Sequence, residues 1–190
     1  MNLKKGMSIL MLVSLLFLLG CQKKAEENKV EENKDQEIKG PSHDNTLPGE
    51  EGMKNTILGY NQAVMDAHLS DKHIKFIRNY AGEKETKRVF VFINTDREKG
   101  VAMAMKLNKI TFDNISSSEK LNTVDTSEHW DFHNLDIKTS KPIEPVREMR
   151  YKLRYILVKE DNKWIVAKLK EREKAVIGEY MPPRWSVTGK

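Results

Sequence analysis

The sequence contains very few residues that could cross-link a fold or carry thiol chemistry. Its 190 residues include one cysteine, Cys21, so the part of the chain after it can form no internal disulfide and no cysteine-ligated metal site. No glycine-rich phosphate loop, nucleic-acid motif or serine with a neighbouring base is visible either. We therefore expect no cofactor, no nucleic-acid partner and no catalytic activity.

Long runs of like charge are also missing, although the charge is unevenly distributed. Residues 22–52 carry five Lys and nine acidic residues, whereas residues 53–190 carry 26 Lys plus Arg and 19 acidic residues. A positive excess is compatible with an anionic partner such as lipid headgroups or cell-wall polymer. A solvated surface with surplus lysine is the simpler interpretation.

The sequence has no hydrophobic run long enough to cross a membrane comfortably. It has one shorter hydrophobic run near the N-terminus, and a cysteine follows that run closely. Residues 7–19 are mostly apolar but fall short of the roughly 20 residues that span a bilayer comfortably. Lys4 and Lys5 precede this run, and it ends in Leu18-Leu19-Gly20-Cys21. An uncleaved anchor or an ordinary secretory signal is one explanation.

This ending resembles the lipobox of bacterial lipoprotein signal peptides, in which a small residue precedes an invariant cysteine. The resemblance implies cleavage between Gly20 and Cys21 and a diacylglycerol thioether on Cys21. We expect residues 1–20 to be a signal peptide and the protein to be extracytoplasmic and lipid-anchored, at the outer membrane if the host has two. Two or more acyl chains give stable attachment, whereas one binds only marginally.

The remainder divides into a tether, a domain and a tail. Residues 21–52 are rich in Lys, Glu, Asn and Asp, with little to bury, and are predicted to be a disordered tether after the acylated cysteine. Residues 53–174 show the periodic apolar patterns of a folded domain. Residues 175–190 are predicted to be a tail.

Helical periodicity dominates the first part of the domain. Met53, Ile57, Tyr60 and Val64 form one stripe, and a second, short helix is expected between Ser70 and Gly82. The run Val89–Ile93 has strand propensity, but its surroundings have helical composition and spacing. We predict a helix over 83–105, with a possible break near residues 94–100.

Strand periodicity dominates the rest. We expect strands from about Lys106 to Ile115 and Lys120 to Leu135, and a hairpin of Val146–Val158 with a strand from Trp164, joined at Asp161-Asn162. Pairing of unlike charges and of apolar residues predicts the hairpin register. The predicted pairs are Glu160–Lys163, Val158–Ile165, Ile156–Ala167, Lys152–Glu171 and Arg150–Glu173.

Helices followed by a four-stranded antiparallel meander predict an α+β fold, with the helices packed on one face of the sheet. This order, the Thr126-Ser127-Glu128-His129-Trp130 stretch and the Asn162-Lys163-Trp164-Ile165-Val166 strand resemble the nuclear-transport-factor-like superfamily. The resemblance implies a curved sheet that forms a cone around the helices and leaves a cavity. Members include enzymes, ligand binders and assembly modules, so the fold does not choose among them.

Two groups of residues could carry chemistry. His129, Asp131 and His133 share one face of a strand and are suitable zinc or iron ligands, but no fourth ligand is evident and a polar strand face is the simpler interpretation. Asp66 and His68, near the end of the first helix, could enter a pocket, where a buried acid can act as a base. A charged residue and a stripe-edge histidine on a helix surface are the simpler interpretation.

Aromatic residues concentrate on the strands, where they form either the core, a cavity wall or a dimer surface. Trp130 is the candidate for a pocket; the others are Phe132, Tyr151, Tyr155 and Trp164.

We expect a non-catalytic binding or assembly module of the cell envelope, with an envelope protein as partner and a possible homodimer through the sheet face. One alternative is a small-ligand binder or enzyme that uses the cone cavity, and another is a module that contacts anionic cell-wall polymer. A filled interior would favour assembly, whereas a deep cavity with a buried ionisable group would favour a ligand.

Overall fold

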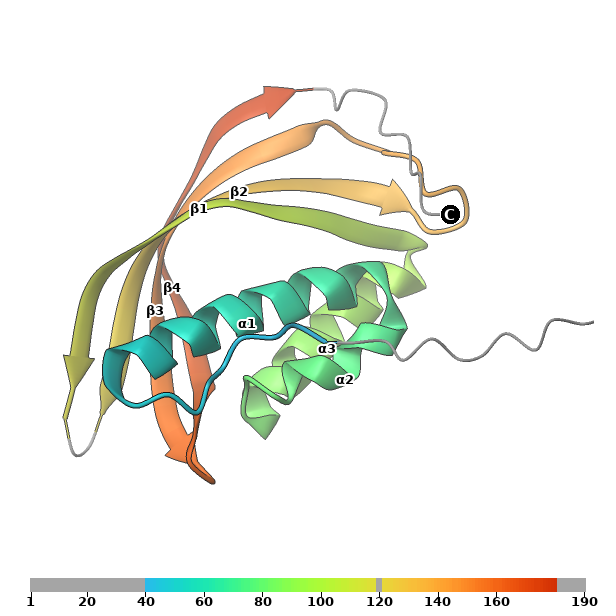
Figure 1. Cartoon of the computed structure of the whole chain (residues 1–190). Helices are drawn as coiled ribbons and strands as arrows, with labels where there is room; N and C mark the ends of the chain where they lie inside the picture. Colours follow the sequence, from blue (N-terminus) through green and yellow to red (C-terminus); the bar gives the residue numbers. More distant parts are fainter. Residues whose placement is uncertain (1–39, 119–120, 181–190) are drawn as a thin grey trace, which may run out of the picture. The chain divides into compact units, whose positions relative to one another are not determined.

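A layer of helices lies against the concave face of one strongly curved sheet in the computed structural model, which describes residues 40–118 and 121–180 (Figure 1). The helical elements are α1 (Gly49–Leu69), the short 3-10 helix η1 (Asp71–His73), α2 (Ile74–Ile77) and α3 (Glu83–Glu98). The strands are β1 (Val101–Ser117), β2 (Asn122–Asp136), β3 (Val146–Glu160) and β4 (Lys163–Tyr180). They pair antiparallel in the order β1-β2-β3-β4, which confirms the predicted α+β class.

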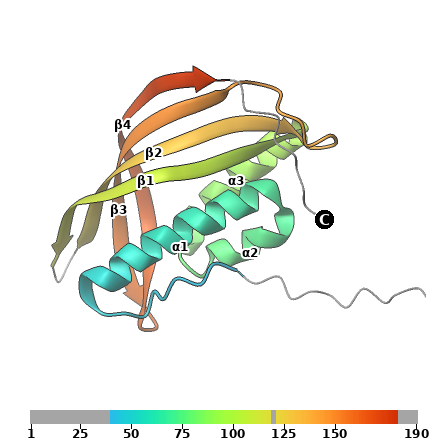
Figure 2. The same ribbon diagram turned by 45° about the horizontal axis from the view of Figure 1, so that its top comes forward.

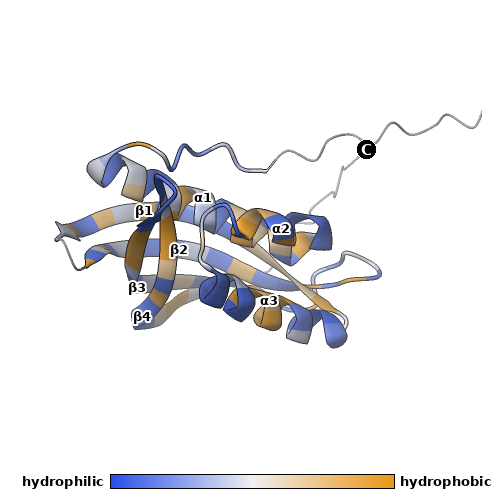
Figure 3. Cartoon of the chain, turned by 90° about the horizontal axis from the view of Figure 1, so that it is seen from below, coloured by the Kyte–Doolittle hydropathy of each residue, from blue (hydrophilic) through white to orange (hydrophobic). Residues whose placement is uncertain are grey.

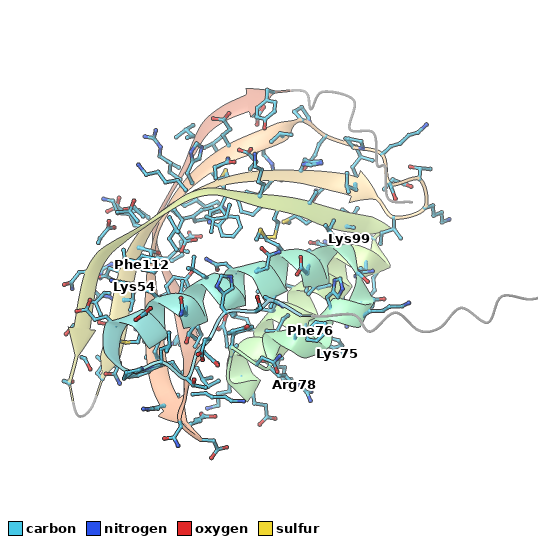
Figure 4. All side chains as sticks on the ribbon, viewed as in Figure 1. Lys54, Lys75, Phe76, Arg78, Lys99 and Phe112 are labelled. Atoms are coloured by element: carbon cyan, nitrogen blue, oxygen red, sulfur yellow. The ribbon has the colours of Figure 1, made fainter. Side chains whose placement is uncertain are left out.

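The helices all lie on the same side of the sheet in both views (Figures 1 and 2). The predicted stripe of α1 is confirmed, because Met53 and Ile57 are fully buried and Tyr60 is buried as well. At the other edge of the helix, the Lys54 ammonium lies 5.9 Å from the centre of the Phe112 ring on β1 (Figure 4). Apolar burial and this cation–π contact hold α1 in the curve of the sheet.

The folded domain begins earlier than the sequence predicts. α1 starts at Gly49 instead of Met53, and the segment before it packs on the domain. Asn45 is buried, and its Nδ2 donates to the carbonyl oxygens of Asn79 (2.8 Å) and Trp164 (3.2 Å). The Tyr80 hydroxyl donates to the carbonyl of Pro41 at 2.7 Å. The prediction of a tether is therefore wrong for residues 40–52, while residues 21–39 lie outside the described part of the chain.

The prediction of a helix after Gly82 is confirmed for α3 and wrong for its last residues. Val89 and Ile93 are buried, and all three residues between them are exposed. This is the spacing of a helix, because a strand would bury every second residue. Residues 101–105 form the start of β1 instead, after Gly100 turns the chain with φ +77°. Figure 3 shows the resulting apolar band on α3, whose exposed members are Phe90, Val91 and Phe92.

β2 follows the predicted alternation closely. The alternate residues on the side opposite His129 and Asp131 are Val124, Thr126, Glu128 and Trp130, all of them buried, and Phe132, which is partly buried. Their neighbours in sequence point to the convex side, where most are only partly covered. A charged side chain, that of Glu128, is thus held on the face of the sheet that meets the helices.

The hairpin turn is confirmed, but much of the predicted register is wrong. Asp161 and Asn162 have φ values of 48° and 64°, and the pairs Glu160–Lys163 and Val158–Ile165 form as predicted. Irregularities at Ile156/Leu157, Lys152/Leu153 and Glu148/Met149 then place extra residues in β4, so the three remaining predicted pairs do not form. Such bulges increase local twist and bend a strand. The pairs found are Ile156–Lys168, Lys152–Glu173 and Arg150–Ala175.

β4 also runs further than expected, to Tyr180, so the prediction of a tail is wrong for residues 175–180. The Tyr180 hydroxyl donates to Asp131 Oδ2 on β2 at 3.1 Å. Antiparallel pairing with β3, which extends to the pair Val146–Tyr180, supplies hydrogen bonds to the backbone of this segment. The rest of the predicted tail, residues 181–190, lies outside the described residues.

Candidate functional site: a cavity with a buried carboxylate

A cavity of about 510 Å³ lies between α1, α3 and the concave face of the sheet. Volumes of this size are usual for small-molecule sites. The predicted concentration of aromatic residues on strands supplies much of its wall, and two helical residues complete it. The aromatic lining is Tyr60, Phe92, Trp130, Phe132, Tyr151 and Tyr155.

The carboxylate of Glu128 is a buried part of the wall and accepts three hydrogen bonds. The residue is 2% exposed. Its Oε1 accepts hydrogen bonds from the Thr126 hydroxyl (2.9 Å) and the Tyr155 hydroxyl (2.8 Å), and its Oε2 accepts from the Trp130 indole N–H (2.7 Å). Burial raises the pKa of Glu128 above its usual range, and the hydrogen bonds oppose this rise because they favour the ionised form.

Asn61 of α1 borders this group. Its Oδ1 lies 3.2 Å from the Tyr155 hydroxyl, but the single phenolic proton is engaged at the shorter distance to Glu128. Asn61 is buried, and its Nδ2 has no hydrogen-bond partner among the described residues. The Asn61 side chain nevertheless lowers the pKa of Glu128, so it belongs to the same polar network as the carboxylate.

A second buried acid, Glu85 of α3, differs from Glu128 because it has a cationic partner. Glu85 Oε1 accepts from the Tyr60 hydroxyl at 2.6 Å, and Arg88 Nε lies 3.1 Å from each of its oxygens. Burial raises the pKa of Tyr60 well above its usual value, and the charge of Glu85 adds to the effect. The Tyr60 ring meets the Tyr155 ring edge-on, with centroids 6.3 Å apart, so the two networks touch.

The remaining aromatic wall is a connected stack on β2 and β3. Trp130 and Phe132 stack with centroids 5.8 Å apart, and Phe132 meets Tyr151 edge-on at 6.0 Å. Such contacts contribute about 0.5–1.5 kcal/mol beyond their area burial and fix the ring orientations. The cavity therefore presents ordered aromatic surfaces.

Of the three residues predicted to line a pocket, His68 and Trp130 do so and Asp66 does not. Burial, with a smaller effect from Arg97, lowers the pKa of His68 to about 4, so this histidine is neutral at neutral pH. Asp66 is partly exposed on α1, and its Oδ1 accepts a hydrogen bond from Gln62 Nε2 at 2.8 Å. Asp66 lies one position outside the buried stripe of α1, and for this reason its side chain points away from the cavity.

The predicted strand cluster lies on the convex face, and its members interact elsewhere. His129 Nε2 is 3.9 Å from Glu148 Oε2, and Asp131 accepts from Tyr180. His133 is buried, and burial lowers its pKa. Across residues 40–118 and 121–180, no group of three His, Cys, Asp or Glu side chains is arranged to hold a metal ion.

Sequence reasoning missed Glu128 as a site residue. The signal was present, because an acid occupied the predicted inward face of a strand between Thr126 and Trp130. Buried acids require partners, so the position pointed to either an ion pair or a polar network. Its partner Tyr155 is 27 residues away and could not be identified before the strands were placed.

Comparison with known proteins supports the fold alone. No protein-family model matches the chain, and no curated protein matches it. The crystal structure of the intermembrane space region of the chloroplast protein ARC6 is similar, with a TM-score of 0.58 at 12% identity over 66% of this chain and 97% of that one. Within the described residues, no helix combines the length and apolar character needed to cross a membrane.

Proposed function

We propose that this protein is an extracytoplasmic, lipid-anchored module that binds a small, largely apolar molecule in its cavity without transforming it. The observation that supports binding is the aromatic-lined space of about 510 Å³ with Glu128 and Asn61 buried in its wall. A deep cavity with a buried ionisable group is the feature expected of a ligand binder rather than of an assembly module. The ending Gly20-Cys21 supports the lipid anchor.

We also propose that the domain has a nuclear-transport-factor-like cone fold. The order of helices and strands supports this assignment, as do the three irregularities of β4, since bulges bend strands and a cone needs a bent sheet. Several ligand-binding folds enclose their site between such a sheet and its helices, so the assignment agrees with a role in binding.

A bulky side chain that fills the cavity should weaken binding of an apolar ligand. Val64 lines the cavity from α1, so Val64→Trp is expected to weaken binding of a neutral apolar dye such as Prodan at least about tenfold, a loss of about 1.4 kcal/mol. The measurement is dye fluorescence titrated with the full-length chain. Val91→Trp is the matched control, because Val91 lies on α3 with 54% of its surface exposed.

The control variant should bind the dye as the unmodified protein does. If the unmodified protein fails to bind the dye, or if both variants weaken binding equally, the cavity is not a ligand site and the proposal of a binder is wrong. Circular dichroism of both variants establishes that the fold is retained.

Removing the acylated side chain should release the protein from membranes. Cys21→Ala deletes the thiol that the lipobox resemblance assigns to diacylglycerol. We expect the variant to leave the membrane fraction after a high-salt wash, because salt screens the remaining electrostatic contacts. Cell fractionation and immunoblotting measure this. Retention of the washed variant at the level of the unmodified protein would contradict lipid anchoring.

A further inference from the structure

The charge at the base of the cavity has no counterpart in the protein. No ion pair among the described residues includes Glu128, and the groups that hydrogen-bond to it are all neutral: the side chains of Thr126, Trp130 and Tyr155, with a further contribution from Asn61. Buried charges in proteins are normally paired, and their interactions are stronger in a low-dielectric interior. The nearby Glu85 follows this rule through Arg88, whereas Glu128 does not.

Aromatic rings line the cavity beside this carboxylate. Trp130 donates its N–H to Glu128, and a donor bonded to an anion becomes richer in electrons on its ring. The stack continues through Phe132 to Tyr151. Ring faces attract cations, and indole does so best. The ammonium of Lys174 already uses one of these rings, since its Nζ lies 5.6 Å from the centre of Tyr151.

Two of the three Arg and Lys side chains that line the cavity have acidic ion-pair partners. Arg88 pairs with Glu85, and the Arg147 guanidinium lies 2.8 Å from Glu144 Oε1. Glu171 lines the same side as Lys174. His68 adds no charge at neutral pH, because burial holds its pKa at about 4. With Glu128 ionised, the acidic side chains in and beside the cavity wall (Glu85, Glu128, Glu144 and Glu171) exceed the basic ones (Arg88, Arg147 and Lys174) by one.

We propose that the cavity binds a small organic cation, an apolar or aromatic molecule that carries one ammonium group. This inference rests on the proposed ligand-binding function and specifies the class of ligand. The ammonium lies against the aromatic wall close to the Glu128 carboxylate, which lines the same cavity and accepts the Trp130 N–H at the edge of the indole ring, and the apolar part of the ligand fills the remaining space. An anion would approach the same carboxylate and be repelled.

Three probes of nearly equal shape test the sign of the charge. They are (3-hydroxyphenyl)trimethylammonium, its neutral isostere 3-tert-butylphenol and the anion 3-hydroxybenzenesulfonate, each titrated into the full-length chain by calorimetry. We expect the cation to bind at least about tenfold more tightly than the neutral isostere, and the anion to bind most weakly.

Two variants test whether Glu128 and Trp130 contribute to binding of the cation. Glu128→Gln retains the shape of the side chain and is expected to weaken binding of the cation about tenfold, while the neutral isostere changes by less than about twofold. Trp130→Phe retains an aromatic ring, and the weaker attraction of benzene for cations should reduce the preference for the cation about threefold or more. The second variant provides an answer if the first does not fold.

The outcomes separate this inference from the proposed function. If the neutral isostere or the anion binds as tightly as the cation, or if the preference for the cation persists in both variants, the cavity is a binding site but not one for cations. If none of the three binds at millimolar concentration and Prodan is also not bound, both proposals are overturned.

Discussion

Glu128→Leu should lower the free energy of unfolding by about 3 kcal/mol or more. The substitution removes the acceptor of the Thr126 and Tyr155 hydroxyls and the Trp130 indole N–H, all of which remain buried. Each buried donor without a partner costs about 1–3 kcal/mol. The Thr126 hydroxyl and the Trp130 N–H would lose this acceptor, and the Tyr155 hydroxyl would retain only the longer contact to Asn61 Oδ1 at 3.2 Å, so the apolar surface gained from leucine, about 2 kcal/mol at most, does not offset the loss. Since domains are stable by about 5–15 kcal/mol, such a loss is large.

Urea unfolding, followed by circular dichroism, measures this change. The matched control is Glu173→Leu, because Glu173 sits on β4 with a side chain 66% exposed and pairs with Lys152 at the surface. Exposed ion pairs contribute about 0–1 kcal/mol, so the control should lose little. Equal losses in the two variants would show that the Glu128 network does not stabilise the fold.

Gly52→Ala should destabilise the protein by about 3 kcal/mol, at the upper end of what overpacking costs. A Cβ atom at Gly52 would lie 1.9 Å from the carbonyl oxygen of Leu47 and 2.5 Å from Cδ1 of Trp164. The same oxygen accepts the indole N–H of Trp164 at 3.2 Å, so the methyl group would disturb this hydrogen bond as well. The better helix propensity of alanine returns only about 1 kcal/mol.

The comparison is with Gly82→Ala, where the nearest atom to a new Cβ is 3.8 Å away. We expect this control to lose less than about 1 kcal/mol, the usual range for a change at a helix start. Thermal unfolding and tryptophan fluorescence of both variants measure the difference. A Gly52→Ala protein as stable as Gly82→Ala would mean that residues 40–48 do not pack against α1 as the structure describes.

The sequence predicted the parts of the fold that depend on local periodicity. The alternation of β2 and the turn at Asp161-Asn162 both follow from residues adjacent in the chain. The packing of residues 40–48 could not be found this way. This packing depends on hydrogen bonds from Asn45 to residues as distant as Trp164. The segment 40–48 itself contains almost no apolar residues that could predict it.

The candidate site was predicted in the same uneven manner. Trp130 and His68 were identified because a bulky or titratable residue stood on an inward stripe. Asp66 was a wrong candidate for the same reason, since it stands one position outside that stripe. The exceptional feature of Glu128 is its set of partners, and whether a buried acid has a cation beside it depends on contacts between distant strands.

The irregularities of β4 have a consequence for which residues line the cavity. Trp164 and Val166 pack inside at even positions, Leu169 and Glu171 line the cavity at odd ones, and Lys174 returns to even. Each bulge thus resets which alternate residues face inward. The bulges therefore separate the residues of β4 that pack at the hairpin end, Trp164 and Val166, from the charged residues that line the cavity, Glu171 and Lys174.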